Sequence, residues 1–277
     1  MLELQNLSYS YTRLHKALDG VSLSIDNGLC LLLGENGAGK TTLLGVISGE
    51  LLAEDGSATF NGEDIGQRLP STMNRIFFLP DNFRVPFRNI AEMARCHAPF
   101  YPDFDSSMLM ENLKAFGLDG KERLKDLSLG MRQKTFIAYA LALRPSLLLL
   151  DEPANGLDIN SKKEFRRMVS RCTSEDQTVI ISTHTVADLE VLYDSVAILH
   201  KGRTRVSLRT EEISRRLAFV TSATEVEDAL YQERDSGVYR AIVETPAPYS
   251  TAVNFELLYS ALMKDEDDRI LQLLTNQ

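Results

Sequence analysis

The glycine-rich segment Gly34–Thr41, with the sequence GENGAGKT, places the strongest constraint on how this chain can fold. The apolar run Cys30–Leu33 directly before it predicts a short buried strand, and Thr41–Ser48 after it predicts a helix. A glycine-rich loop in that position turns its backbone N–H groups toward an anion at the helix N-terminus. We therefore expect a phosphate-binding loop at the edge of an α/β sheet, with a nucleoside triphosphate as its ligand.

The residues of this loop have distinct predicted roles. We expect Lys40 to reach the β- and γ-phosphates of the nucleotide, and the Thr41 hydroxyl to be a ligand of Mg²⁺. The residues of the segment that are predicted to bind the nucleotide, which is ATP if the family resemblance described below holds, are Gly34, Glu35, Asn36, Gly37, Ala38, Gly39, Lys40, Thr41 and Thr42.

Two adjacent carboxylates follow a second apolar run. Leu147–Leu150 consists of four leucines, and Asp151 and Glu152 come directly after it. A buried strand in this position delivers both carboxylates to the edge of the sheet where the phosphate loop lies. Asp151 is expected to hold Mg²⁺, and Glu152 to polarise the attacking water as a general base, which predicts hydrolysis of the triphosphate.

Strands and helices alternate along most of the chain. After a β-rich start and a helical stretch at about 85–130, the expected elements are a helix at Met131–Leu143, a strand at Ser146–Leu150, a helix at Lys162–Cys172, a strand at Thr178–Ser182, a helix at Val186–Leu192 and a strand at Ser195–His200. This order predicts the α/β class. We expect a P-loop NTPase fold with a central, mostly parallel sheet, an N-terminal antiparallel β subdomain and an inserted small helical subdomain.

The pattern of apolar and polar residues changes near residue 205. We expect residues 1–204 to form the ATPase domain and residues 205–277 a small α+β appendage. The expected elements of the appendage are strands at Leu217–Thr221 and Tyr239–Glu244, a helix at Glu225–Tyr231 between them, and an acidic helix at Asn254–Lys264.

Composition excludes several other classes of protein. Thirty Lys and Arg against 39 Asp and Glu give a net charge of −9, and such an acidic chain is a poor general binder of nucleic acid. The three cysteines are scattered, which indicates neither a disulfide framework nor a zinc site and fits a reducing cytosol. No run approaches the roughly 18–20 apolar residues of a membrane-spanning helix, and the first ten residues do not look like a signal peptide. Work at a membrane would therefore require a partner.

Three further motifs make the chain resemble the ATP-binding subunits of ABC transporters. Leu127–Met131 is similar to the family's signature loop, usually LSGGQ, with Leu129 in place of a glycine and Met131 in place of the glutamine. Asn155–Asp158 resembles the D-loop of the family. His184, which follows an apolar strand, resembles its switch histidine.

The resemblance spans about Leu2–Gly202 and implies roles for the residues that match. Ser128 and Gly130 would contact the γ-phosphate, and Ser128 is also expected to cap a helix. Asp158 would join the ATP-binding residues, and His184 would act with Glu152 in catalysis. Tyr11 would stack on the adenine ring, with Tyr9 as its close competitor; a core tyrosine is the alternative for either.

One position departs from the family pattern. The family has a glutamine that contacts Mg²⁺ and the attacking water, whereas this chain has Asp81. Asp81 is either a shorter, charged Mg²⁺ ligand or a residue that faces the partner. As a ligand it would add a third carboxylate near Asp151 and Glu152, and mutual repulsion would then favour a raised pKa in this group.

The resemblance also implies partners. Two chains would enclose two ATP molecules, each between the phosphate loop of one chain and the Ser128 region of the other. We therefore expect a homodimer, or a heterodimer with a related ATPase subunit, bound to an integral-membrane permease at the cytoplasmic face of the membrane. The surface for the permease is expected near Phe83–Pro102, with plain subdomain core as an equal alternative. The short insert with Tyr101–Asp105 and the C-terminal tail are similar to subunits of exporters.

Two alternatives belong to other functional classes. A soluble ABC ATPase of translation or DNA repair would carry two ATPase units or long coiled coils, and this chain shows neither. An ATP sensor with low turnover is favoured by Asp81 and opposed by Glu152 and His184.

Overall fold

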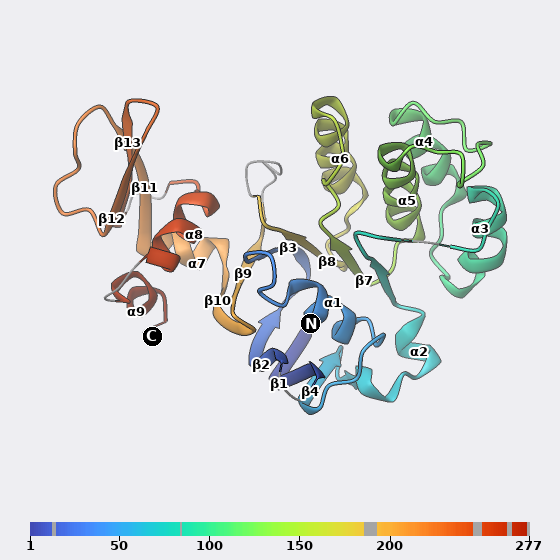
Figure 1. Cartoon of the computed structure of the whole chain (residues 1–277), viewed down its shortest axis with the longest axis horizontal. Helices are drawn as coiled ribbons and strands as arrows, with labels where there is room; N and C mark the ends of the chain where they lie inside the picture. The colour runs from blue at the N-terminus through green and yellow to red at the C-terminus, as the bar shows by residue number, and fades with distance from the viewer. Residues whose placement is uncertain (13–14, 84, 186–192, 246–250, 265–267, 276–277) are drawn as a thin grey trace.

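The computed structural model of the chain describes residues 1–12, 15–83, 85–185, 193–245, 251–264 and 268–275. The strands in these ranges form three sheets (Figure 1). The helix expected at Val186–Leu192 lies outside the described residues.

The central sheet contains the two motif-bearing apolar runs. Its strand order is β10-β9-β3-β8-β7-β6, with β3 (Gly28–Leu33), β6 (Ile76–Leu79), β7 (Leu147–Asp151), β8 (Thr178–Thr183), β9 (Ser195–His200) and β10 (Arg203–Arg209). Neighbouring strands are parallel except for the antiparallel pair β9 and β10. The predicted α/β class with a mostly parallel central sheet is confirmed.

Both faces of the central sheet are buried, and successive side chains enter opposite cores. In β3, Leu29, Leu31 and Leu33 belong to one hydrophobic cluster, whereas Cys30 and Leu32 belong to the other. Strands buried on both faces read as continuous apolar runs. This explains why these strands could be located in the sequence without any alternation of polar residues.

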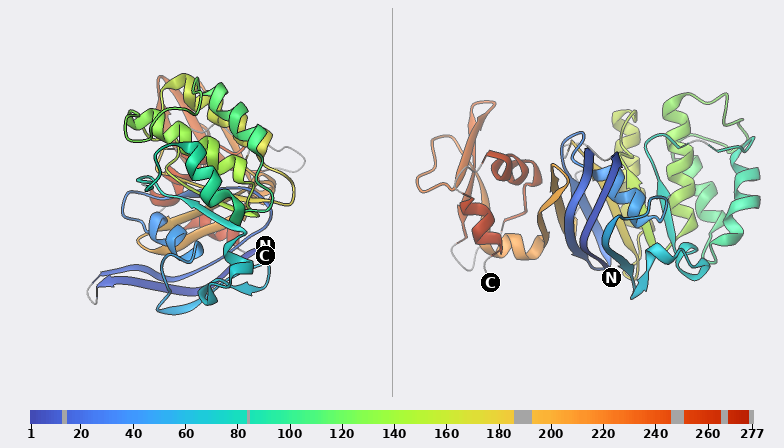
Figure 2. Two further views of the ribbon diagram at one scale, coloured as in Figure 1. Left: turned by 90° about the vertical axis from the view of Figure 1, so that its right-hand side faces the viewer. Right: turned by 60° about the horizontal axis from the view of Figure 1, so that its bottom comes forward.

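An antiparallel sheet covers one face of the central sheet (Figure 2). Its strand order is β2-β1-β4-β5, with β1 (Leu2–Thr12), β2 (His15–Ile25), β4 (Asp55–Phe60) and β5 (Glu63–Asp64). Helix α1 (Lys40–Ile47) contributes Leu43 and Leu44 to the core between the two sheets. A 3-10 turn at Ile65–Gln67 and α2 (Pro70–Met73) lead to β6. The predicted N-terminal antiparallel sheet is present.

The insert expected at about 85–130 is helical. It contains α3 (Ile90–His97), a 3-10 turn at Ala98–Phe100 and α4 (Ser106–Ala115), and it packs with α5 (Leu129–Leu143), which is followed after β7 by α6 (Ile159–Cys172). The side chains of Asn89 and Asp105 cap α3 and α4. Helix α5 begins two residues before the predicted start, because Ser128 caps it by accepting a hydrogen bond from the Met131 N–H.

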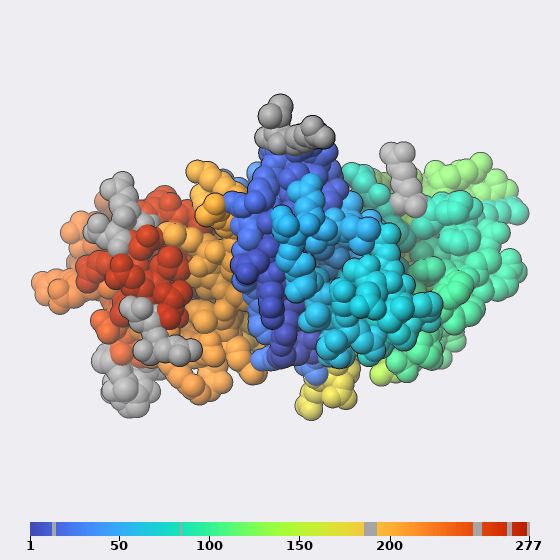
Figure 3. Space-filling view, turned by 90° about the horizontal axis from the view of Figure 1, so that it is seen from below, coloured from blue at the N-terminus to red at the C-terminus, as the bar shows by residue number. Residues whose placement is uncertain are grey.

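The C-terminal region lies at the end of the molecule opposite to the helical insert (Figure 3). It contains a sheet of order β11-β13-β12 and three helices: β11 (Leu217–Ser222), β12 (Tyr231–Asp235), β13 (Val238–Glu244), α7 (Thr210–Arg216), α8 (Phe255–Lys264) and α9 (Arg269–Thr275). The helix predicted at Glu225–Tyr231 is wrong. Residues 223–230 form turns and irregular structure, and Tyr231 begins the strand β12 that pairs with β13.

The C-terminal region shares its packing with the central sheet. Strand β10 runs through the expected boundary at residues 204 and 205 and pairs with β9. Leu257, Leu258, Ala261 and Leu262 of α8 belong to the same hydrophobic cluster as the leucines of β3. The two parts are therefore joined by a strand pair and by one continuous core.

Among the described helices, none is both long and apolar enough to span a bilayer.

Candidate functional site

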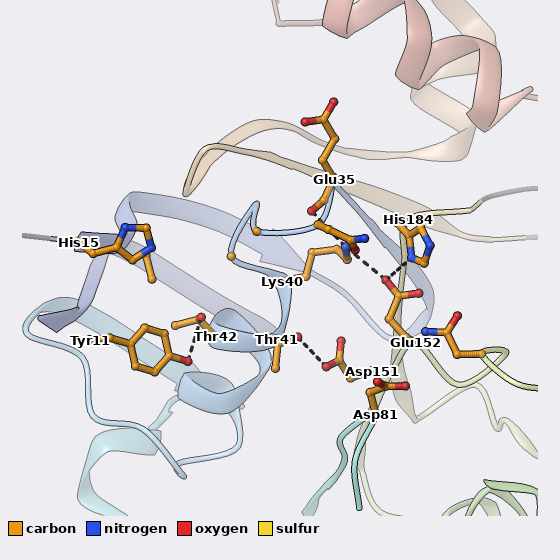
Figure 4. A pocket seen from close by; sticks show the side chains of 15 residues that line it. Tyr11, His15, Glu35, Lys40, Thr41, Thr42, Asp81, Asp151, Glu152 and His184 are labelled. Atoms are coloured by element: carbon orange, nitrogen blue, oxygen red, sulfur yellow. Dashed lines mark hydrogen bonds and ion pairs between the residues drawn. The ribbon is translucent and has the colours of Figure 1, made fainter. Parts of the chain in front are cut away.

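A cavity of about 470 Å³ opens at the carboxyl edge of the central sheet (Figure 4). The phosphate loop follows β3, Asp81 follows β6, Glu152 follows β7 and His184 follows β8. The lining residues are Tyr11, His15, Ala17, Glu35, Asn36, Gly37, Gly39, Lys40, Thr41, Thr42, Asp81, Asp151, Glu152, Asn155 and His184. Ligands of parallel α/β sheets bind at this edge, so the topology brings the two sequence motifs together.

The loop requires glycine at two positions where the backbone comes close to other segments. Gly39 has φ of 104°, and a Cβ there would lie 2.7 Å from the Ala17 carbonyl oxygen. A Cβ on Gly34 would lie 2.7 Å from the Leu199 carbonyl oxygen. Both distances are shorter than van der Waals contact, so the loop holds this shape only with glycine at these two positions.

The Lys40 ammonium is buried and held by the loop itself. It donates to the carbonyl oxygen of Gly34 at 2.7 Å and, less closely, to that of Glu35 at 3.4 Å. It also lies 3.3 Å from the Glu152 carboxylate. The two carbonyl oxygens and the Glu152 carboxylate compensate the charge of the buried ammonium group while the cavity holds no anion. Lys40 also lies at the phosphate loop, where phosphate oxygens of a nucleotide would contact it.

Asp151 is buried at the end of β7. It accepts hydrogen bonds from the Thr41 hydroxyl at 2.7 Å and from the Ser182 hydroxyl at 2.5 Å. Burial raises the pKa of Asp151 although both hydroxyls oppose the shift, and the nearby Glu152 charge adds to it. A buried carboxylate in this state gains from a cation beside it, so the Thr41 and Asp151 oxygens fit the Mg²⁺ that the sequence predicts.

Glu152 occupies a tight turn directly after the strand. Its φ of 46° is unusual for a residue other than glycine, and its N–H donates to Ser182, whose backbone and hydroxyl oxygens each lie at 3.1 Å. Its carboxylate meets His184 Nδ1 at 2.9 Å. The predicted general base and the predicted switch histidine are therefore in direct contact.

Asp81 lines the same cavity as Asp151 (Figure 4). No three His, Cys, Asp or Glu side chains of the described residues are grouped closely enough to hold a metal ion by themselves. A cation at Thr41 and Asp151 would therefore need further oxygen ligands, and phosphate oxygens and water are the usual ones for Mg²⁺.

Tyr11 and Tyr9, the two candidates for adenine stacking, have different environments. Tyr11 lines the cavity, is 57% exposed, and its hydroxyl lies 3.2 Å from the Thr42 hydroxyl. Tyr9 packs against the core beneath the antiparallel sheet and meets the Tyr11 ring edge-on at 5.1 Å. Of the two rings, that of Tyr11 is accessible to a ligand in the cavity.

Ser128, Gly130 and Asp158 are not among the described residues that line the cavity. Asp158 caps α6 through Ser161 and forms an ion pair with Lys134 at 2.9 Å. A Cβ on Gly130 would lie 3.1 Å from the Gly156 carbonyl oxygen, so the signature and D-loop segments of one chain are packed together. Asn155, at the start of the D-loop, lines the cavity, whereas Ser128, Gly130 and Asp158 lie outside its lining.

Sequence reasoning missed four residues of the site. His15 and Ala17 reach the cavity from β2, Asn155 follows the Glu152 turn, and Ser182 holds both Asp151 and Glu152. Ser182 belongs to an apolar run and gave no signal, because its partners are 30 or more residues away. Asn155 is the only one of these four residues that belongs to a motif recognised in the sequence, the D-loop, so it could have been predicted.

Comparisons with known proteins agree with this geometry. A sequence model of the ABC transporter family matches residues 18–155. The lantibiotic transport ATP-binding protein SrtF of Streptococcus pyogenes is 31% identical over 208 residues, which are 73% of this chain and 88% of SrtF. The ABC transporter ATP-binding protein YhcH of Bacillus subtilis is 28% identical in an alignment that covers 100% of this chain and 88% of YhcH.

A solved structure of an ATP-binding subunit of an ABC transporter is also similar. It superposes with a TM-score of 0.68 at 27% identity and covers 78% of this chain and 92% of its own. The chain therefore belongs to the family of ABC transporter ATP-binding proteins and is an ATPase of that family.

Proposed function

We propose that the chain is the subunit of an exporter that hydrolyses ATP to drive a separate membrane permease. The observation that carries the proposal is that one cavity contains groups suited to phosphate binding, to cation binding and to activation of water. A buried lysine faces the phosphate position, a hydroxyl and a carboxylate are paired for a cation, and a glutamate is in contact with a histidine.

The contacts of Glu152 suggest how the chain prepares for hydrolysis. In the structure its Oε1 atom lies near both Lys40 and His184. When Lys40 turns to the phosphates of ATP, this carboxylate oxygen loses its ion pair and is free to accept a proton from the attacking water. His184 would keep the carboxylate oriented. Thr41 and Asp151 would hold Mg²⁺, which neutralises charge on the phosphate oxygens.

The position of Ser128, Gly130 and Asp158 supports a two-chain ATP sandwich. These residues lie outside the chain's own cavity, and two large apolar side chains beside them are exposed, Leu129 by 69% and Ile159 by 85%. A second chain placed over this surface would cover both side chains. It would also bring Ser128 and Gly130 to the ATP in the partner's cavity, in a homodimer or in a heterodimer with a related ATPase.

The permease would dock on the helical insert, at the cytoplasmic face of the membrane. A surface hollow of about 590 Å³ lies there, lined by Pro86, Phe87, Arg88, Glu92, Arg123 and Lys125. Apolar and basic groups at a concave site suit a short amphipathic helix with an acidic end. The streptococcal relative is named for lantibiotic transport, which supports a transporter with a peptide cargo.

Capture from membranes tests this proposal. Tagged full-length protein is mixed with detergent-solubilised membranes, and bound proteins are identified by mass spectrometry. We expect a permease with several membrane spans, recovered by the wild type and by the control Arg209→Glu but much less by Arg88→Glu. Recovery of ribosomal proteins or DNA in place of a membrane protein would contradict the transporter role.

A further inference from the structure

The turn between β9 and β10 packs against the phosphate loop. It consists of Lys201 and Gly202, with φ of 48° and 76°, and it joins the paired residues His200 and Arg203 as a two-residue hairpin turn. The Gly202 N–H donates a hydrogen bond of 3.0 Å to the Ala38 carbonyl oxygen of the loop. Gly202 is not among the described residues that line the cavity, so its contact with the loop lies outside the cavity.

The same turn is fixed to strand β2. The Gly202 carbonyl oxygen accepts a hydrogen bond of 2.8 Å from the Asp19 N–H. The Arg203 guanidinium pairs with the Asp19 carboxylate, with Nε 2.8 Å from Oδ2. A Cβ on Gly202 would lie only 2.7 Å from the Ala17 carbonyl oxygen. The two backbone polar groups of Gly202 therefore connect β2 to the phosphate loop, at a place that has no room for a side chain.

The hydrogen bond from Gly202 also sets the direction of an N–H group in the loop. The carbonyl of Ala38 and the N–H of Gly39 belong to one planar trans peptide, in which the C=O and N–H bonds point in opposite directions. Because the Ala38 carbonyl points toward Gly202, the Gly39 N–H points away from the turn. Gly39 lines the cavity, and the N–H groups of such a loop are the donors that bind phosphate oxygens.

Two further close approaches accompany this hydrogen bond. A Cβ on Gly39 would lie 3.7 Å from the Gly202 Cα atom. The Leu199 carbonyl oxygen, near the end of β9, approaches the loop at Gly34, where a Cβ would lie 2.7 Å from it. The end of β9 and the turn therefore contact both the first and the last glycine of the loop, and a displacement of the turn would disturb the loop at both ends.

We propose that Gly202 is a positioning residue of the phosphate loop, which orients the peptide between Ala38 and Gly39 so that the Gly39 N–H faces the phosphates. The proposal rests on the ATP-binding function of the cavity. Gly202 acts through this peptide and does not touch the nucleotide. Because the peptide is held in place before ATP arrives, less ordering of the loop remains to be done when ATP binds.

Gly202→Ala in the full-length protein tests the proposal, because the added methyl group would push the turn away from Ala17 and from the loop. The matched control is Gly237→Ala. Gly237 is also the second residue of a two-residue hairpin turn, that between β12 and β13. Its φ is 90°, and a Cβ there would meet nothing within 4 Å. Both variants place alanine at a positive φ, so they differ in the contact with the loop.

The affinity for ATP is measured by calorimetry in Mg²⁺-free buffer, and kcat and KM in Mg²⁺. We expect Gly202→Ala to weaken ATP binding and raise KM by about tenfold, the lower end of the range for one hydrogen bond to a charged group. The kcat should change much less, because the loop binds the phosphates in the ground state and in the transition state alike. Gly237→Ala should bind ATP as the wild type does. Unchanged ATP affinity in Gly202→Ala, or an equal loss in both variants, would overturn the proposal.

Hydrogen exchange in the wild type is a second measurement, which does not depend on the folding of Gly202→Ala. Local opening of the turn exposes the Gly202 amide to exchange. If the turn and the loop are coupled, ATP in Mg²⁺-free buffer should slow exchange of the Gly202 amide several-fold more than that of the Gly237 amide. An equal effect on both amides would contradict the proposal. A wild-type protein that binds no ATP would instead refute the function on which the proposal rests, so the two failures are distinguishable.

Discussion

Two hydroxyl groups, those of Thr41 and Ser182, donate to the buried Asp151 carboxylate. Burial raises the pKa of this carboxyl in the folded state, so the folded protein binds this proton more readily than the unfolded chain does. Stability therefore falls as the pH rises from the unfolded pKa to the folded pKa, and the loss is complete above the folded pKa. The buried negative charge of Asp151 therefore lowers the free energy of unfolding when no cation is bound beside it.

We expect Asp151→Asn to stabilise the metal-free protein at neutral pH, because it removes the buried charge and keeps the shape. An increase in Tm of about 2–4 °C would correspond to about 1 kcal/mol in a domain of this size. Differential scanning fluorimetry from neutral to acidic pH measures it, and the advantage should shrink as the pH falls. Added Mg²⁺ and ATP should stabilise the wild type more than the variant, which keeps the phosphate loop but loses a carboxylate for Mg²⁺. A lower Tm for Asp151→Asn at neutral pH would contradict this electrostatic interpretation.

At the level of single elements, the N-terminus of α5 combines two roles in one side chain. Ser128 caps the helix by accepting a hydrogen bond from Met131 at 3.3 Å, and it is also the residue predicted to contact the γ-phosphate in a partner chain. Substitutions can separate the roles, because glycine is a tolerable N-cap and alanine is not.

Ser128→Ala should destabilise the protein by about 0.5–2 kcal/mol through loss of the cap. Ser128→Gly should destabilise it by only a few tenths of a kcal/mol. Both variants lose the hydroxyl, so both should lose ATP-driven dimerisation and hydrolysis. Chemical denaturation gives the stability, and phosphate release gives the activity. If Ser128→Gly retained full activity, the hydroxyl would have no role in the site.

The elements that sequence reasoning located best are those with a local physical cause. The apolar runs at Cys30–Leu33 and Leu147–Leu150 are buried on both faces and became strands within one or two residues of the prediction. Helix α5 begins at Leu129, two residues before the predicted start at Met131, and the expected cap at Ser128 is confirmed.

The elements that sequence reasoning missed depend on distant partners. Strand β12 is polar and is held by pairing with β13, so its own sequence gave no strand pattern. The tight turn Ser236-Gly237, with φ of 50° and 90°, fits a hairpin and was the available local signal. His15 reaches the cavity only because β2 pairs with β1, where Thr12 lies opposite it.

At the scale of the whole molecule, the central sheet and the C-terminal region are one packed body. Strand β10 extends the central sheet past the expected boundary, and α8 shares the core of β3. We expect the full-length chain to unfold in a single calorimetric transition, because neither part can lose its core without exposing the other. Two resolved transitions, with the second one shifted by ATP, would show that the C-terminal region is an independent unit.

The central claim is that Glu152 is the general base of an ATPase that works as a two-chain sandwich, and Glu152→Gln tests it most directly. Phosphate release and molar mass are measured on the same sample with saturating Mg²⁺ and ATP, with Glu175→Gln as a surface control. We expect hydrolysis to fall by about 10²–10⁴-fold, and the mass to rise from 31.0 kDa to twice that value, while the control behaves as the wild type. Hydrolysis by Glu152→Gln at the wild-type rate would contradict the account, whatever the mass.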